Sequence, residues 1–263
     1  MIRMRSRFVA VAYPAVPVLV GLGIWELIVA VRDVPVYLLP APSRIAQVFF
    51  KKFGILADHS IVTLQEVLIG YAASVVLGVL LAVMIVQWRP FERSVYPLLV
   101  TSQTVPKMAL APLFVVWFGF GLVPKVLVVF LIAFFPIVID SVVGLRTVQP
   151  EMLSLAASMG ANKIQILRQF RLPSALPSIF AGMKVAITLS VVGAVVGEFI
   201  AGDRGLGYLI QLSAYNFQVP LLFGAILMLV AMGMVLFLII QVAELVFVPW
   251  NTEKVGRQRA IGA

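Results

Sequence analysis

Long apolar stretches recur along most of the chain, and each is long enough to cross the hydrocarbon core of a membrane as a helix of about 20 residues. Hydrophobic residues make up 62% of the 263 residues and charged residues only 12%, which is too little charge to cover a water-soluble globule. A transmembrane barrel would show short alternating segments instead. The pattern therefore predicts an all-α polytopic membrane protein with six transmembrane helices, near Ala10–Val31, Ile61–Gln87, Tyr96–Phe120, Pro124–Leu145, Pro177–Ile200 and Pro220–Val248.

The N-terminus resembles a signal peptide, because Arg3, Arg5 and Arg7 precede an apolar stretch. That stretch is long, lacks a convincing small-residue cleavage site and is followed by further spans, so we interpret it as a retained signal-anchor helix. The predicted organisation is a cytoplasmic N-terminus at 1–9, a first span with an outer amphipathic segment at 10–59, a core of five spans at 60–248 and a basic cytoplasmic tail at 249–263.

The distribution of basic residues sets the expected orientation. With the N-terminus in the cytoplasm, Lys and Arg are more numerous on the cytoplasmic side than on the outer side, so both termini are predicted inside. The net charge of +9 is then a topology signal that also attracts anionic lipid, and no nucleic-acid partner is expected. The residues predicted on the outer side are Arg32, Arg44, Lys51, Lys52, Lys125 and Arg204.

Several chemistries are excluded by residues that the chain lacks. It has no cysteine and a single histidine, His59, so a cysteine or histidine-rich metal site is not expected, nor a Ser-His-Asp set. It has no Gly-x-x-x-x-Gly-Lys-Ser/Thr loop, so this chain is not expected to bind or hydrolyse ATP.

Two connections between spans are long. In the outer one, prolines at 35, 40 and 42 predict an extended stretch, and Ser43 is expected to cap a short amphipathic helix. That helix either lies in the membrane interface or forms a platform for an outside partner.

In the inner connection, 146–176, Pro150 begins a helix, Gly160 ends it, Asn162 caps a second helix, and Pro173 and Pro177 end that one. This hairpin either lies on lipid or forms a rigid knob that fits a groove in another protein.

A family resemblance favours the knob. Ala156-Ala157, Gly160 and Leu172-Pro173 resemble the cytoplasmic loop signature of ABC importer permeases, with Leu155 at the usual acidic position and Phe170 at the usual isoleucine. The resemblance implies that this loop docks on an ATPase subunit through residues among Glu151, Leu155, Ala156, Ala157, Gly160, Asn162, Lys163, Arg168, Leu172 and Pro173.

Three further stretches are similar to permeases for nitrate, sulfonates, taurine and thiamine precursors: Leu39–Ser43, Pro106–Gly119 and Val195–Tyr208. The resemblance implies a type I importer fold in the bacterial cytoplasmic membrane. It also implies a second permease copy in a homodimer, two cytoplasmic ATP-binding subunits that use ATP and Mg, and an extracytoplasmic substrate-binding protein. From the residues alone, an ATP-independent carrier or channel and a polytopic membrane enzyme stay open.

Polar residues inside the spans are candidates for the translocation path, because charge there is costly. Glu198 either lines this path or is structural, paired with Arg204 or bonded to loop amides. Lys107 either attracts an anionic substrate or extends to the interface. Asp140 is expected to pair with Arg146. The candidate path residues are Gln103, Thr104, Lys107, Thr188 and Glu198.

Small residues recur every fourth position in two spans. Gly70, Ser74 and Gly78 do so in the second span, and Gly193 and Gly197 in the fifth. Between helices in lipid, small residues allow close backbone approach, so these positions are predicted to be helix-packing faces within one subunit or between two.

Overall fold

The computed structural model describes residues 2–250, and this part of the chain contains helices and connecting turns but no strand. Most of the predicted tail, from 251 onward, lies outside the described residues. The helices are α1 (Ile2–Val31), α2 (Pro42–Lys51), α3 (Phe53–Gln87), α4 (Arg89–Ser102), η1 (Lys107–Leu110), α5 (Ala111–Phe118), α6 (Leu122–Leu145), α7 (Pro150–Ser158), α8 (Lys163–Ile166), η2 (Leu167–Arg171), α9 (Leu172–Ala201), α10 (Leu206–Tyr215) and α11 (Val219–Phe247).

Four of the described helical segments are long and apolar enough to cross a membrane, or five if a bent pair counts as one span. The bent pair corrects the prediction of one helix over Tyr96–Phe120, because α4 and the segment Lys107–Phe118 meet at 89°. Pro106 lies in the break between them and has no N–H to continue a helical ladder. The first predicted span belongs to α1, whose segment Val16–Val31 is apolar. The six-span layout stays a prediction.

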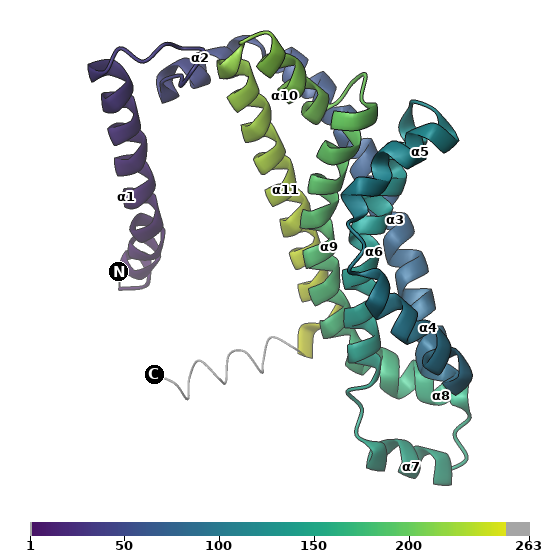
Figure 1. The fold of residues 1–263 in the computed structure, drawn as a ribbon. Helices are drawn as coiled ribbons and strands as arrows, with labels where there is room; N and C mark the ends of the chain where they lie inside the picture. Colours follow the sequence, from purple (N-terminus) through teal and green to yellow (C-terminus); the bar gives the residue numbers. More distant parts are fainter. Residues whose placement is uncertain (1, 251–263) are drawn as a thin grey trace.

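The long helices run back and forth between two ends of the molecule (Figure 1). The helices α2 and α10 lie at one end, called here the α10 end, while α7 and α8 lie at the other, called the α7 end. Most of helix α1 stands apart from the bundle, which it contacts near the α10 end through α2 and through Trp25 against Phe223 of α11.

The centre of the fold is α6, which packs between α3 and α9. A Cβ on Gly70 would lie 2.6 Å from Val129 Cγ1 of α6, and one on Gly193 would lie 3.1 Å from Val129 Cα. Larger side chains at these positions would push the helices apart, since packing of this kind depends on close backbone approach. All of the predicted packing residues lie against α6: Gly70, Ser74, Gly78, Gly193 and Gly197.

The prediction that Pro173 and Pro177 end the second helix of the inner connection is wrong. Helix continues from α8 through the π-turn η2 into α9, with Pro173 in the first turn of α9 and Pro177 inside it. Proline has no backbone N–H to donate, and the π-turn η2 directly before Pro173 is where the helical hydrogen-bond pattern changes. The fifth span therefore belongs to one helical segment, Lys163–Ala201.

Ser43 does not cap α2 as expected, because the helix begins one residue earlier, at Pro42. The N–H and hydroxyl of Ser43 instead donate to the carboxylate of Glu26 on α1, at 3.0 and 2.7 Å. A carboxylate at a helix N-terminus is favourable, so Glu26 both stabilises α2 and joins α1 to it.

Candidate functional site

The most distinctive surface is the knob at the α7 end, formed by α7, the turn at 159–162 and α8 (Figure 1). The amide of Ala161 donates to Ala156 O and that of Gly160 to Ala157 O, each at 3.0 Å. This pair of bonds is a Schellman motif, which requires a left-handed residue, and Gly160 supplies it with φ of +84°. The predicted role of Gly160 in ending α7 is confirmed.

The second helix of the knob begins as predicted at Asn162. The Asn162 side chain accepts from the amide of Gln165 at 2.9 Å, and the Gln165 side chain accepts from the amide of Asn162 at 2.7 Å. This reciprocal capping box satisfies two N–H groups that have no partner inside the helix. With the Schellman motif before it, the turn is held by hydrogen bonds on both sides, which makes the knob rigid.

The knob exposes apolar side chains that the fold does not cover. Leu155 is 62% exposed, Met159 80% and Ile164 72%, whereas Ala156 is buried. A hollow of about 260 Å³ beside the turn is lined by residues that include Gly160, Gln165 and Phe170. Exposed apolar surface of this kind, rimmed by the exposed polar residues Lys163 and Arg168, is typical of a contact with another protein.

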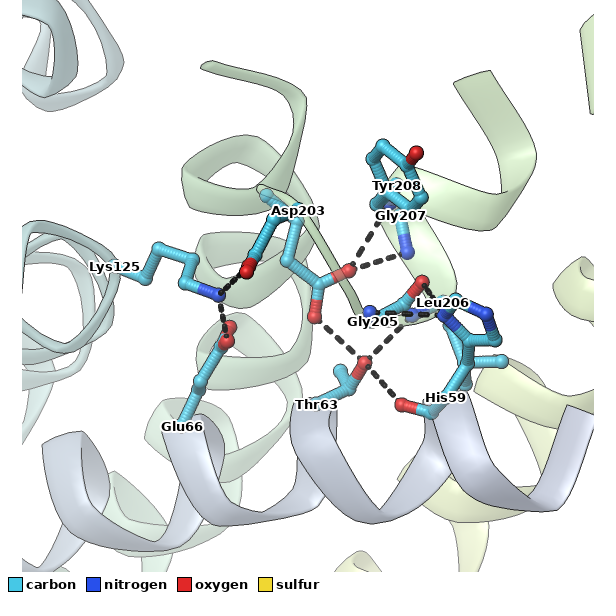
Figure 2. Close-up of polar contacts among 10 residues, drawn as sticks. His59, Thr63, Glu66, Lys125, Asp203, Gly205, Leu206, Gly207 and Tyr208 are labelled. Atoms are coloured by element: carbon cyan, nitrogen blue, oxygen red, sulfur yellow. Dashed lines mark hydrogen bonds and ion pairs between the residues drawn. The ribbon is translucent and has the colours of Figure 1, made fainter. Parts of the chain in front are cut away.

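A buried polar cluster lies near the α10 end, where the turn from α9 to α10 meets α3 (Figure 2). The carboxylate of Glu198 is fully buried and accepts from the amides of Gly207 and Tyr208 and from the hydroxyl of Thr63. The same Thr63 oxygen accepts from Leu206 N at 2.8 Å. Glu198 therefore holds the first turn of α10 against α3.

His59 extends this contact by one helical turn of α3. Its Nδ1 accepts from Gly205 N at 3.0 Å, or in the other tautomer donates to Gly205 O at 2.9 Å. Gly205 has φ of +116°, and a Cβ there would overlap the Glu198 carboxylate. The turn is thus closed by a glycine that no other residue can replace without moving Glu198.

Beside this cluster lies a buried ion pair that the sequence analysis did not foresee. Lys125 Nζ on α6 lies 2.6 Å from Glu66 Oε1 on α3, with the two side chains 3% and 0% exposed. Figure 2 shows Lys125 between Glu66 and Asp203, and the Asp203 carboxylate is 3.9 Å away and mostly exposed. Lys125, predicted among the outer basic residues, is therefore a buried partner of α3.

The candidate path residues do not form one cluster. Lys107 Nζ donates to Gln103 O at 3.3 Å and lies 4.5 Å from the ring centroid of Phe135, and Gln103 and Thr104 are exposed. Thr188 is exposed on α9 and donates to Val185 O. Within the described part of the chain, no hydrogen bond or ion pair joins Lys107 or Thr188 to Glu198.

Comparison with known proteins identifies the family. The family described as binding-protein-dependent transport system inner membrane component matches residues 74–252. This chain belongs to that family. Its relatives include the formylaminopyrimidine transport permease protein ThiX of Halalkalibacterium halodurans, 38% identical over 88% of this chain and 92% of ThiX. The riboflavin transport system permease protein RibX of Chloroflexus aurantiacus is 36% identical over 86% of this chain and 85% of RibX.

Weaker relatives and the fold agree with this assignment. The taurine transport system permease protein TauC of Escherichia coli is 25% identical, over 88% of this permease and 87% of TauC. A chain of the inward-facing MetNI methionine ABC transporter has a TM-score of 0.67 and 17% identity, over 75% of this permease and 98% of that chain. The permease thus has the type I ABC importer fold, and the predicted ABC importer permease family is confirmed.

Sequence reasoning missed the ion pairs that join different helices of this permease. Lys184 on α9 pairs with Glu244 on α11 at 2.8 Å. Arg146, expected beside Asp140, instead pairs with Glu92 at 2.6 Å. The sequence does signal these pairs, because a single charged residue inside or at the end of an apolar span needs a partner. The partner lies on another helix, however, so the spacing of residues along the chain does not identify it.

Replacement of Glu198 by leucine should destabilise the permease by about 2–4 kcal/mol, because two buried amides and one hydroxyl lose their acceptor. Glu198→Gln keeps one acceptor oxygen and should cost less than half as much. Thermal unfolding in detergent would measure both. Unchanged melting in Glu198→Leu would show that the contact with α10 is dispensable, and loss of transport with unchanged melting in Glu198→Gln would favour the predicted role in the path.

Proposed function

We propose that this permease is one of two identical membrane subunits of an importer that also contains two cytoplasmic ATPase subunits and an extracytoplasmic binding protein. The observation that carries the proposal is the rigid knob at the α7 end, with its exposed Leu155, Met159 and Ile164. Its position between α6 and α9 matches the loop that couples to the ATPase in this family. The α7 end is then the cytoplasmic end, as the basic residues predict.

In this arrangement, ATP and Mg are used by the ATPase chains and the permease alternates between outward and inward openings. The movement enters through the docking residues proposed from the resemblance and passes along α9. The proposed path runs beside the exposed polar residues Gln103, Thr104 and Thr188 and the half-buried Lys107, with Glu198 holding the outer turn. An ATP-independent carrier is disfavoured, because such a carrier has no use for a rigid apolar knob outside its bundle.

The substrate proposed here is a small heteroaromatic solute. Support comes from relatives named for formylaminopyrimidine and riboflavin, at 38% and 36% identity, compared with 25% for the relative named for taurine. Both higher-identity names denote nitrogen heterocycles, which makes an aliphatic sulfonate the second choice.

Reconstitution with the cognate ATPase and binding protein in proteoliposomes tests this function. Uptake of a labelled aminopyrimidine or flavin should require both ATP and the binding protein, and excess taurine should not compete. Uptake that continues without ATP would support a carrier or channel instead. ATP-dependent uptake of taurine alone would keep the importer and refute the heteroaromatic substrate.

A further inference from the structure

A cationic pocket lies at the α7 end, between the end of α3 and the base of the knob. Its volume is about 430 Å³. Three basic residues from different elements line it: Arg89 at the start of α4, Lys163 at the start of α8, and Arg171 at the end of η2. No carboxylate lines the pocket.

The basic residues of this pocket lack a directly paired carboxylate within the described residues. Arg89, Lys163 and Arg171 form no ion pair there, and Arg171 Nε is buried without a hydrogen-bond partner. The nearby carboxylate of Glu92 is held by Arg146 at 2.6 Å. Burying a guanidinium N–H without an acceptor is costly, so the pocket favours an anion with several acceptor oxygens.

An exposed apolar stripe leads along α3 to this pocket. Leu77 is 50% exposed, Leu80 55% and Met84 40%, and their spacing of three and four residues places them on one side of the helix. Trp88, 59% exposed, directly follows the end of α3 and lines the pocket. Tryptophan at the end of a span is typical of the membrane interface, so an apolar tail on this stripe would place its head group at Arg89 and Arg171.

We propose that this pocket binds the phosphate of an anionic phospholipid, whose acyl chain lies along Leu77, Leu80 and Met84. A bound lipid there contacts α3, α4 and the base of the knob at once and stabilises their relative position. The proposal does not depend on the substrate or on the assignment of the knob to an ATPase.

Native mass spectrometry of the full-length permease in detergent tests the site, with phosphatidylglycerol as the probe. Arg171→Gln should weaken phosphatidylglycerol binding by about tenfold, since a charge-assisted hydrogen bond is lost. The matched control is Arg168→Gln, an exposed cation three residues away that does not line the pocket, and it should change binding by less than about twofold. Zwitterionic phosphatidylethanolamine should bind more weakly than phosphatidylglycerol.

The alternatives give different results. Equal losses in Arg171→Gln and Arg168→Gln would overturn the site, because the surface would then attract anionic lipid only diffusely. Displacement of the lipid by millimolar inorganic phosphate would overturn it in favour of a soluble anion. Absence of phosphatidylglycerol from the assembled transporter, when the permease alone retains it, would overturn the site as a feature of the working complex. Both variants should melt close to the wild-type temperature, so that a loss of lipid binding is not caused by unfolding.

Discussion

Replacing Gly160 with valine should abolish coupling, reducing ATP-dependent uptake by at least tenfold while ATP hydrolysis by the assembled transporter continues. At φ of +84°, a β-branched residue is strained by roughly 1–2 kcal/mol or more. The position itself has open space for a Cβ, so the effect comes from the backbone and not from a clash. Relief of the strain would break the Schellman bonds and change the angle between α7 and α8. Uptake and ATPase activity are both measured in proteoliposomes.

The matched control for this prediction is Gly160→Asn. Asparagine tolerates the left-handed region far better than valine, so this variant should retain most of the uptake. If both variants lose uptake equally, the side chain and not the turn geometry disturbs docking. Normal uptake in Gly160→Val with intact assembly would refute the proposed role of the turn.

Replacing Lys125 with methionine should be the most destabilising single change, at about 3–5 kcal/mol. The change keeps much of the side-chain volume and leaves Glu66 fully buried without its counter-ion. A buried unpaired charge is far more costly than the ion pair is stabilising. Thermal unfolding in detergent and the yield of folded protein would measure the effect.

The double variant Lys125→Met with Glu66→Leu separates charge from packing. Because replacement of both partners by apolar groups is often close to neutral, the double variant should recover most of the lost stability. A second comparison is Lys184→Met, which breaks a more exposed pair with Glu244 and should cost less. No recovery in the double variant would mean that Lys125 acts through its packing against Gly197 instead of through its charge.

Features that depend on local sequence were predictable. Pro150, Gly160 and Asn162 begin, end and cap helices through backbone chemistry within a few residues, and the structure has these boundaries. The small residues at 70 and 193 were predictable as packing faces, because their spacing is helical. Neither the helix boundaries nor the packing faces required knowledge of which helix packs against these residues.

Features that depend on distant residues were not predictable. The partner of Lys125 is 59 positions away along the printed sequence, on α3, and nothing in the spacing relates the two. Pro173 and Pro177 suggested a break, but the π-turn η2 shifts the hydrogen bonds ahead of them and the helix continues. At Pro106 the same residue type does break a span. Proline therefore marks a position of altered bonding, and the surrounding packing decides whether the chain bends.

The long helix α9, Leu172–Ala201, has a mechanical consequence. At about 1.5 Å per residue, its 30 residues make a rod of roughly 45 Å, with α8 and η2 at one end and Glu198 near the other. A rod of that length works as a lever: a tilt of a few degrees about its middle moves both tips by a few ångströms in opposite directions. A small movement at the α7 end, where we propose that the ATPase docks, would then reach the α10 end at the same moment and in the opposite direction, without rearrangement of the side chains in between.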